Sequence, residues 1–237
     1  MDASTTLRLQ PAALEIPAAK KALNRLLRLK PAFSLNSPYS PQRPALKTYI
    51  EQQFSNTYGA TITEFLPLLS SMECNGNISA VAGIRPAQKT ELFVERYLDA
   101  PIEVILSQLN QTSIDRSSIV EIGNLSATHR GATLLFFVVQ IAMLHEAGIK
   151  WDVFAATHQV GTIMSKLNFI SLELGPADPA RLGDDASNWG SYYDTQPTIL
   201  ATNIAATMEN LRQSPLTAAV LVLFKDTITE LAQSLRS

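Results

Sequence analysis

Cysteine and charge are both scarce in this sequence, and each scarcity excludes a class of protein. A single cysteine among 237 residues excludes a disulfide framework and a zinc site built from cysteine pairs. None of the three histidines stands four residues from another, so we expect no metal. Charged residues make up 17% and the formal net charge is −2, so the positive field of a nucleic-acid-binding protein is missing and we expect no nucleic-acid partner. The hydrophobic content of 46% indicates a folded chain rather than a disordered one.

Long apolar runs are missing as well. The longest extends over residues 132–144, contains Gln140, and at 13 residues falls short of the roughly 20 that a membrane-spanning helix needs. This run predicts a buried helix instead. Residues 1–10 are polar and resemble no export signal, and with one unpaired cysteine this leads us to expect a cytoplasmic protein.

The amino-terminal part has a pattern of its own. Residues 17–30 place five basic residues among leucines at helical spacing, which predicts a short amphipathic helix. This helix either docks on the domain or makes a peripheral contact with a membrane surface. Residues 34–44 contain three prolines and predict an extended linker. We therefore divide the chain into an amino-terminal helix and linker (1–44), a core (45–176), and a loop with helices that completes the same domain (177–237).

From residue 45 onward, helical periods alternate with β-branched and apolar runs. Helices are predicted near 45–58, 101–109, 131–147 and 160–167, and strands at 61–73, 78–85, 118–125, 149–156 and 171–174. Asn75–Gly76 predicts a hairpin, and the later alternation of strand and helix favours parallel or mixed pairing. Residues 199–211 and 216–235 are predicted to be helical. The expected fold is α/β, with a central mixed sheet, antiparallel first and then parallel, flanked by helices.

The junction between the strand at 118–125 and the helix at 131–147 carries chemical information. Glu121 interrupts an otherwise apolar strand, which is costly for a carboxylate that is neither paired nor functional. After the strand, Arg130 offers a planar cationic fork, and Gly131 permits close approach to the free N–H groups of a helix start. These features suit a diphosphate group. A salt bridge for Glu121 and an exposed surface position for Arg130 are the alternatives.

Four sequence blocks together resemble the thermostable hemolysin family. They are Ile119–Ala127 continuing into Arg130–Ala132, Leu92–Glu103, Leu174–Leu182, and Trp189–Asp194. The resemblance extends from about residue 45 to residue 204. The family resembles the GCN5-related N-acyltransferase fold and, more closely, the acyl-homoserine-lactone synthases built on it. The resemblance implies that residues 45–176 form an N-acyltransferase-like core, whose central strands splay apart around the pantetheine arm of an acyl donor.

The resemblance also implies a site for the donor's diphosphate on the loop and helix start after the fourth strand. Its residues are Leu125, Ser126, Ala127, His129, Arg130, Gly131 and Ala132. The acyltransferase pattern Arg/Gln-x-x-Gly-x-Gly/Ala is met only in part, because Arg130 stands directly before Gly131. Asn124 stands where the lactone synthases have an arginine, a departure that argues against homoserine-lactone or S-adenosylmethionine chemistry.

The implied activity is transfer of an acyl group from acyl-coenzyme A (acyl-CoA) or an acyl-carrier protein to an amine such as an amino acid or its derivative. No tightly bound cofactor is expected. Glu121 is the expected base, Tyr192 or Tyr193 the expected acid, and Asn124 a group that polarises the thioester carbonyl. Further contacts to the amine or substrate are expected from Glu95, Trp189 and Asp194.

Other functions and roles stay open at the level of sequence. The chain could be a membrane-active haemolysin, or a ligand-binding member of the fold without turnover. The aromatic cluster 189–194 could simply pack the carboxyl-terminal helices onto the sheet. The acyltransferase hypothesis makes two structural predictions. Strands 118–125 and 149–156 should lie side by side and separate at their carboxyl ends, and the cluster 189–194 should lie over that gap.

Overall fold

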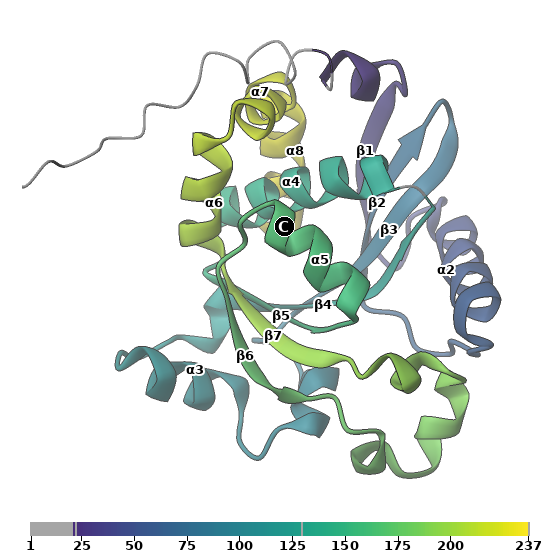
Figure 1. The fold of residues 1–237 in the computed structure, drawn as a ribbon, viewed down its shortest axis with the longest axis vertical. Coiled ribbons are helices and arrows are strands. Elements are labelled where there is room, and N and C mark those ends of the chain that lie inside the picture. Colours follow the sequence, from purple (N-terminus) through teal and green to yellow (C-terminus); the bar gives the residue numbers. More distant parts are fainter. Residues whose placement is uncertain (1–20, 22, 129, 237) are drawn as a thin grey trace, which may run out of the picture.

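A central β-sheet organises the molecule in the computed structural model, which describes residues 21, 23–128 and 130–236, and only the backbone of 130–132 (Figure 1). Within that part, seven strands form one sheet in the order β1-β2-β3-β4-β5-β7-β6. The strands are β1 Pro31–Asn36, β2 Leu68–Cys74, β3 Asn77–Pro86, β4 Ile119–Ala127, β5 Trp151–Ala156, β6 Ser171–Pro176 and β7 Thr198–Asn203. β4 and β5 pair in parallel, and the other described pairs are antiparallel. The predicted mixed sheet is therefore confirmed.

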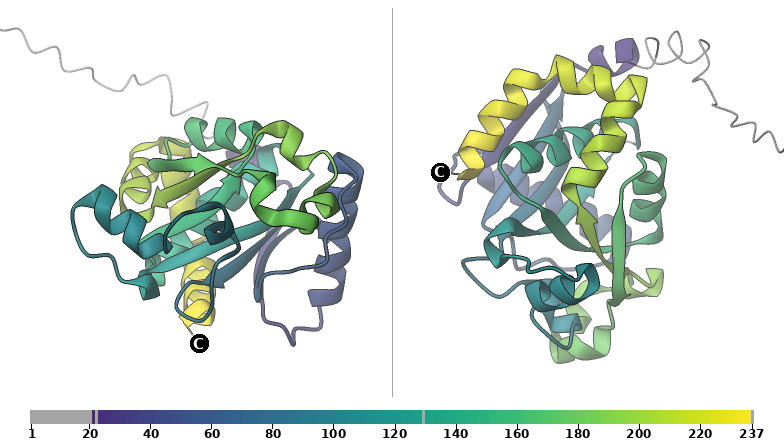
Figure 2. Two further views of the ribbon diagram at one scale, coloured as in Figure 1. Left: turned by 90° about the horizontal axis from the view of Figure 1, so that it is seen from below. Right: turned by 90° about the vertical axis from the view of Figure 1, so that its left-hand side faces the viewer.

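Helices cover both faces of the sheet. The α-helices are α2 Arg43–Tyr58, α3 Ile102–Asn110, α4 Arg130–Glu146, α5 His158–Lys166, α6 Ile204–Gln213, α7 Pro215–Leu223 and α8 Lys225–Arg236. The 3-10 helices are η1 Phe93–Tyr97, η2 Arg116–Ser118, η3 Pro179–Trp189 and η4 Tyr192–Thr195. On one face α4 lies between the sheet and the helices α6, α7 and α8, which form the yellow group in Figure 2. The opposite face is covered by α2 and by η1, α3 and η3.

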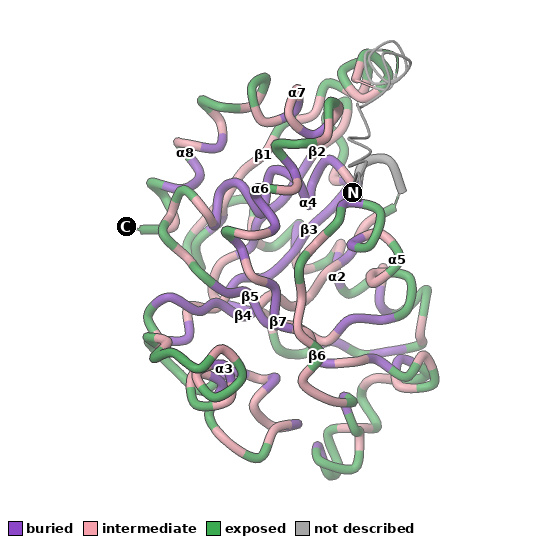
Figure 3. The backbone as a smooth tube through the Cα atoms, turned by 60° about the vertical axis from the view of Figure 1, so that its left-hand side comes forward, coloured by how far each residue is buried: buried purple, intermediate pink, exposed green. Residues whose placement is uncertain are grey.

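The sheet divides the hydrophobic core into parts. The largest part surrounds α4, where Phe136, Val138 and Leu144 are almost completely buried, and this helix follows a continuous buried trace in Figure 3. Two smaller clusters lie on the other face, one around Ile50 of α2 and one around Leu106 of α3. The apolar run that contains Gln140 is therefore a buried helix, as predicted.

Two local signals in the sequence act as expected. Asn75 and Gly76 have φ values of 52° and 78°, the left-handed conformation of a two-residue hairpin turn between β2 and β3. Gly59 has a φ of 65° and ends α2, with its N–H donating to the carbonyl of Ser55 at 2.9 Å. Glycine, which has no steric penalty at positive φ, and asparagine, which tolerates it, thus determine the turn and the helix end.

The predicted linker at 34–44 is wrong in its first part. Residues 34–36 belong to β1, which pairs with β2 as the edge strand of the sheet and begins before the predicted core boundary at Ala45. The edge position tolerates Pro31, which cannot donate a backbone hydrogen bond. The prediction of a strand at 61–73 is also too long, because β2 starts only at Leu68 and the residues before it form a loop.

The predicted helix at 199–211 is wrong in its first five residues, which form β7. A short apolar run cannot be assigned to strand or helix from periodicity alone, and Ile199 and Ala201 are fully buried. The helix α6 starts at Ile204, where the side chain of Asn203 accepts the N–H of Ala206 at 2.9 Å. Because β7 lies between β5 and β6, the expected run of parallel strands is reduced to the β4–β5 pair.

The basic amino-terminal segment is described only in part. Residues 17–20 and 22 of the predicted helix lie outside the described residues, whereas Lys21 and residues 23–27 are helical. Leu23 packs against the main core, as expected for a docked helix. Of the helices in the described part of the chain, none has the length and apolar character needed to cross a bilayer. Peripheral membrane contact stays a prediction.

Candidate active site

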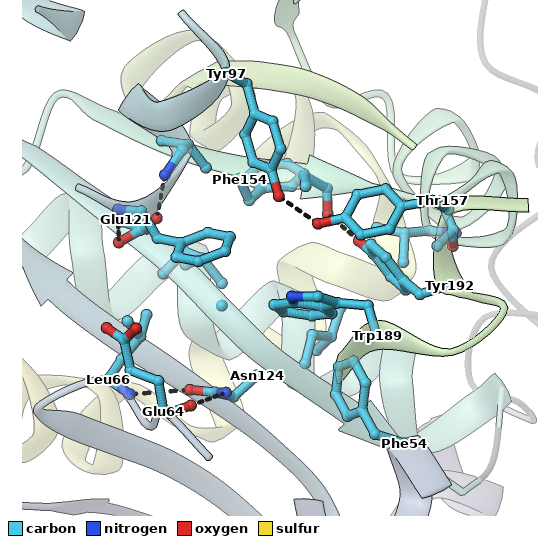
Figure 4. Close-up of a pocket in the computed structure, with 18 of the residues that line it drawn as sticks. Phe54, Glu64, Leu66, Tyr97, Glu121, Asn124, Phe154, Thr157, Trp189 and Tyr192 are labelled. Atoms are coloured by element: carbon cyan, nitrogen blue, oxygen red, sulfur yellow. Dashed lines mark hydrogen bonds between the residues drawn. The ribbon is translucent and has the colours of Figure 1, made fainter. Parts of the chain in front are cut away.

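The parallel strands β4 and β5 separate part-way along their length. Their last parallel pair is Glu121–Val153, although β4 continues to Ala127 and β5 to Ala156. A cavity of about 140 Å³ lies at the gap and is lined by residues of both strands, including Asn124 (Figure 4). The predicted separation at the carboxyl ends is confirmed. We call this cavity the cleft.

Asn124 shapes one side of the cleft. It has a φ of 50°, and the pairing of β3 with β4 shifts register at this point, as in a β-bulge. Its Oδ1 accepts the N–H of Leu66 at 2.9 Å, and its Nδ2 donates to the carbonyl of Glu64 at 3.1 Å. The side chain therefore holds the 61–67 loop against β4 through its oxygen and one N–H group of Nδ2. The expectation that its NH₂ group polarises a thioester carbonyl stays a prediction.

Two glycines let that loop approach the sheet. Gly83 and Gly123 face each other in the β3–β4 pairing. A Cβ at Gly83 would lie 2.7 Å from Leu66 Cβ, and a Cβ at Gly123 would lie 3.0 Å from Leu66 Cδ1. Leu66 thus occupies the space that two side chains would otherwise fill.

Glu121 is the ionisable group at the point of strand separation. Its side chain lines the cleft, yet the residue is only 2% exposed. Oε1 accepts the N–H of Val94 at 2.8 Å, Oε2 accepts the N–H of Phe93 at 3.1 Å, and Arg85 Nη1 lies 3.3 Å from Oε2. Burial raises the pKa of Glu121 to about 7, against the opposing effect of these N–H groups and the guanidinium. The carboxyl is therefore poised to exchange a proton near neutral pH.

Glu95 lies away from the cleft. Its carboxylate forms an ion pair with Arg116 at 2.6 Å and accepts the backbone N–H groups of Leu92 and Ile102 at 2.8 and 2.9 Å. These bonds fix η1 to the start of α3. The structure thus corrects the expectation that Glu95 contacts the amine: its acceptors are already used, and a different carboxylate, Glu64, lines the cleft.

Aromatic side chains form the wall opposite the strands. They are Phe54, Tyr58, Phe93, Tyr97, Trp189, Tyr192 and Tyr193. The rings of Trp189 and Tyr192 have centroids 5.3 Å apart, and those of Tyr192 and Tyr193 are 5.2 Å apart. The prediction that the cluster lies over the gap is confirmed. Its packing partners are α2 and η1, so the alternative of packing against the carboxyl-terminal helices is wrong.

The phenols in this wall are not equivalent. Burial raises the pKa of Tyr192, whose hydroxyl points at the carbonyl of Ala155 at 3.5 Å. The hydroxyl of Tyr193 lies 2.5 Å from that of Tyr97, and although burial raises the pKa of Tyr193, this hydrogen bond opposes the rise. Both groups are protonated at neutral pH and can donate a proton or a hydrogen bond. Asp194, expected as a substrate contact, is exposed and does not line the cleft.

Backbone contacts join this wall to α2. The N–H of Ser191 donates to the carbonyl of Tyr58 at 2.8 Å, and the N–H of Thr61 donates to the carbonyl of Asn188 at 2.7 Å. At Gly190 a Cβ would lie 2.1 Å from the same Tyr58 oxygen, so only glycine allows the two segments to cross. The aromatic wall is thus built into the fold rather than carried on a free loop.

A larger cavity of about 520 Å³ opens beside the cleft, where β4 and β5 end and α4 and α5 begin. Leu125, Ser126 and Ala127 line it, as expected for the donor site. His129 lies outside the described residues. Arg130, Gly131 and Ala132 form the first turn of α4, which is where the diphosphate prediction needs them.

Several residues that line these cavities were not predicted from the sequence. Thr157, His158 and Gln159 at the start of α5 line the larger cavity, together with Lys166, whose charge would favour an anion. Thr157 caps α5 by accepting the N–H of Val160. A threonine directly after an apolar strand and before an amphipathic run is a detectable helix-start signal. Tyr58 and Tyr97 had no such signal, since they reach the cleft from separate elements.

Comparison with known proteins agrees with this geometry. Residues 36–208, most of the chain, match the family described as Thermostable hemolysin. The chain belongs to this family. No curated protein matches it in sequence.

Three solved structures illustrate which folds this thermostable hemolysin family member resembles. TofI in an apo form has 13% identity and a TM-score of 0.53, covering 78% of this chain and 99% of that one. FeeM, an N-acyl amino acid synthase from uncultured soil microbes, has 14% identity and a TM-score of 0.51, covering 76% and 95%. BjaI, a CoA-dependent acyl-homoserine lactone synthase solved with SAM and isopentyl-CoA, has 11% identity and a TM-score of 0.51, covering 84% and 89%. The fold is therefore acyl-CoA N-acyltransferase-like, with the mixed sheet and flanking helices described above.

Proposed function

We propose that this protein is an N-acyltransferase that moves an acyl group from an acyl thioester, carried on coenzyme A or an acyl-carrier protein, to an amine. The observation that carries the proposal is the separation of β4 and β5. The Glu121 carboxyl, whose pKa is about 7, lies at the point where the two strands separate. The fold shared with an N-acyl amino acid synthase and a CoA-dependent lactone synthase supports it.

The donor would enter through the larger cavity. Its phosphates would lie at the first turn of α4, whose free N–H groups and positive dipole end favour an anion, with Lys166 nearby in the wall. The larger cavity and the cleft share Leu125, Thr157 and Val160 in their linings. An extended arm can therefore reach from one to the other and bring the thioester beside Glu121.

The chemistry needs one proton acceptor and one proton donor. The amine nitrogen attacks the thioester carbonyl carbon, the C–N bond forms, the C–S bond breaks, and the proton leaving the nitrogen goes to Glu121. The departing thiolate takes a proton from Tyr193. Tyr97, at 2.5 Å, then donates its hydrogen bond to the Tyr193 oxygen and stabilises the phenolate. Tyr193 suits this role better than Tyr192, which is more deeply buried and directed at a carbonyl.

The acceptor would bind on the side of the cleft lined by η1 and the aromatic wall. Glu64 lines the cleft next to Asn124, with its side chain 61% exposed; its Oε1 pairs with Arg85 at 2.5 Å, which leaves Oε2 to attract an ammonium group before deprotonation. The aromatic rings offer apolar faces for the rest of the molecule. An amino acid or an amino-acid derivative has both features, which is why we assign the acceptor to this class.

The direct test is mass spectrometry of products formed by the purified protein from a panel of acyl-CoA thioesters and amines. We expect an N-acylated amine from the wild type, and from a Glu51→Gln control on the exposed side of α2. Glu121→Gln should form the product at least about 10²-fold more slowly. Coenzyme A thioesters and acyl-carrier-protein thioesters, offered separately, distinguish the donor. A folded protein that binds donor but makes no product would show a ligand-binding role instead.

A lytic effect would follow from the same activity. An N-acylated amino acid has a charged head and an alkyl tail, so it can disrupt a bilayer without insertion of the protein. Red-cell lysis by protein-free reaction extracts, but not by the protein with its substrates omitted, would support this origin. Lysis by the Glu121→Gln protein alone would contradict it.

A further inference from the structure

A third, smaller cavity continues the cleft into the core beneath α4. Its volume is about 40 Å³, and it shares Ile122, Leu125, Phe154 and Val160 with the cleft. The rest of its wall is almost wholly apolar and comes from α4, α5 and the strands. By position and polarity, it is where the tail of an acyl chain would lie once the thioester is beside Glu121. We call it the tail pocket.

Two polar side chains interrupt this apolar wall. Gln140, in the middle of α4, is 7% exposed, and Asp152 of β5 is 4% exposed. Within the part of the chain that the structure describes, Gln140 Oε1 and Asp152 Oδ1 are the buried side-chain atoms without a hydrogen-bond partner. Both residues line the tail pocket. Leaving a buried acceptor unpaired destabilises the folded protein, so two in one small cavity point to an occupant that pairs with them.

The free atoms specify the chemistry of that occupant. Both are oxygens, so a saturated chain would leave both unpaired. A keto group, which only accepts, could pair with a protonated Asp152 but would leave Gln140 Oε1 unpaired. A hydroxyl is the small group that can both donate and accept. Burial also raises the pKa of Asp152 to about 7, although the hydroxyl of Thr202 hydrogen-bonds to the carboxyl and opposes the rise. A protonated Asp152 could donate to a hydroxyl oxygen while the hydroxyl donates to Gln140.

We propose that the tail pocket selects acyl donors whose chain carries a hydroxyl group, with Gln140 and Asp152 as the residues that recognise it. This inference rests on the proposed acyltransfer function and adds the substrate class. The tail pocket has a volume of about 40 Å³, so it can hold only the segment of the acyl chain that bears the hydroxyl group.

The test compares each hydroxyacyl-CoA with the plain acyl-CoA of equal length, with the hydroxyl at the second, third or terminal carbon. Wild-type kcat/KM should favour one hydroxyacyl donor by about tenfold or more. In Gln140→Leu and Asp152→Leu this ratio should fall toward one, because each variant replaces a hydrogen-bonding group by an alkyl group, while activity with the plain donor persists. Gln108→Leu, on the exposed side of α3, is the matched control and should keep the wild-type ratio. Since the readout is a ratio within one protein preparation, a general loss of stability does not imitate the effect.

Two outcomes would overturn the inference. One is a wild-type ratio near one for every hydroxyl position. The other is a preference that persists in both variants, which would mean that a water molecule or the two side chains themselves satisfy the acceptors. Failure of the acyltransferase proposal is distinguishable, since it would give no product from either donor. Calorimetric binding of the same donor pairs to Glu121→Gln then decides the selectivity without turnover.

Discussion

Replacing Glu121 by glutamine should change catalysis and stability in opposite directions as pH rises. The folded protein raises the pKa of this carboxyl from 4.5 to about 7, so folding favours the protonated form. Its contribution to stability is therefore greatest below pH 4.5, declines as pH rises from 4.5 to about 7, and is constant above that. At 1.36 kcal/mol for each pH unit, the total decline is about 3 kcal/mol.

Glutamine is neutral throughout this range, so it removes the pH-dependent loss. It also replaces one acceptor oxygen by an NH₂ group facing the N–H of Phe93 or Val94, at a cost of about 1–3 kcal/mol. We expect Glu121→Gln to be less stable than wild type at pH 5, and to approach or exceed wild-type stability at pH 8. Urea unfolding at the two pH values measures the difference. The variant loses the ion pair between Glu121 and Arg85, and the pKa of about 7 already includes the effects of Arg85 and Glu64 on Glu121.

The rate should behave differently. Wild-type kcat/KM for acyl transfer should increase as pH passes about 7, because the ionised carboxyl is the base, and then level off. In Glu121→Gln this increase of kcat/KM with pH should disappear, and only the increase caused by deprotonation of the amine substrate should remain. At pH 8 the variant should be slower than the wild type by about 10²–10⁴-fold. A constant ratio of wild-type to variant rates between pH 5 and 9 would refute the assignment of Glu121 as base. An unchanged stability difference over the same range would refute the raised pKa.

Three further changes test other parts of the site. Tyr193→Phe should lower turnover by about 10²-fold with donor affinity intact, whereas equal turnover in steady-state assays would require another acid. Gly83→Ala should lower the free energy of unfolding by about 1–3 kcal/mol, because its Cβ would lie 2.7 Å from Leu66 Cβ. Gly161→Ala, with nothing within 4 Å of the added Cβ, is the control and should be neutral or stabilising in thermal melts. Gly131→Glu, at the first turn of α4, should weaken coenzyme A binding about tenfold, or about 1.4 kcal/mol, and unchanged calorimetric affinity would exclude a phosphate site there.

The parts of the fold predicted correctly are those where one local signal decides the conformation. Asn75–Gly76 determines a hairpin by backbone sterics alone, and the long apolar run around Gln140 is too long for a strand. The β7 segment was mistaken for helix because Ile199–Asn203 is short and buried on both faces, so its strand character comes from β5 and β6, which are distant in sequence.

The residues of the candidate site likewise fall into those that a local signal identifies and those whose role depends on a distant partner. Glu121 stood out because a carboxylate in an apolar strand is rare, and Trp189 because aromatic residues cluster there. Glu95 was misplaced because its partner, Arg116, is 21 residues away and no local pattern joins them. The role of Asn124 depends on Leu66, 58 residues away, and is visible only in the folded chain.

The two tryptophans of the chain stand in contrasting surroundings, which gives the protein a built-in optical reporter. Trp151 is 5% exposed at the paired end of β4 and β5, where the strands do not separate, whereas Trp189 stands in the aromatic wall of the cleft. A molecule entering the cleft should change the surroundings of the Trp189 indole and leave those of Trp151 unchanged. The emission of Trp151 can thus serve as an internal reference, and Trp189→Phe should abolish any ligand-dependent change. Affinities for unlabelled donors and amines become measurable by fluorescence before any turnover has been detected.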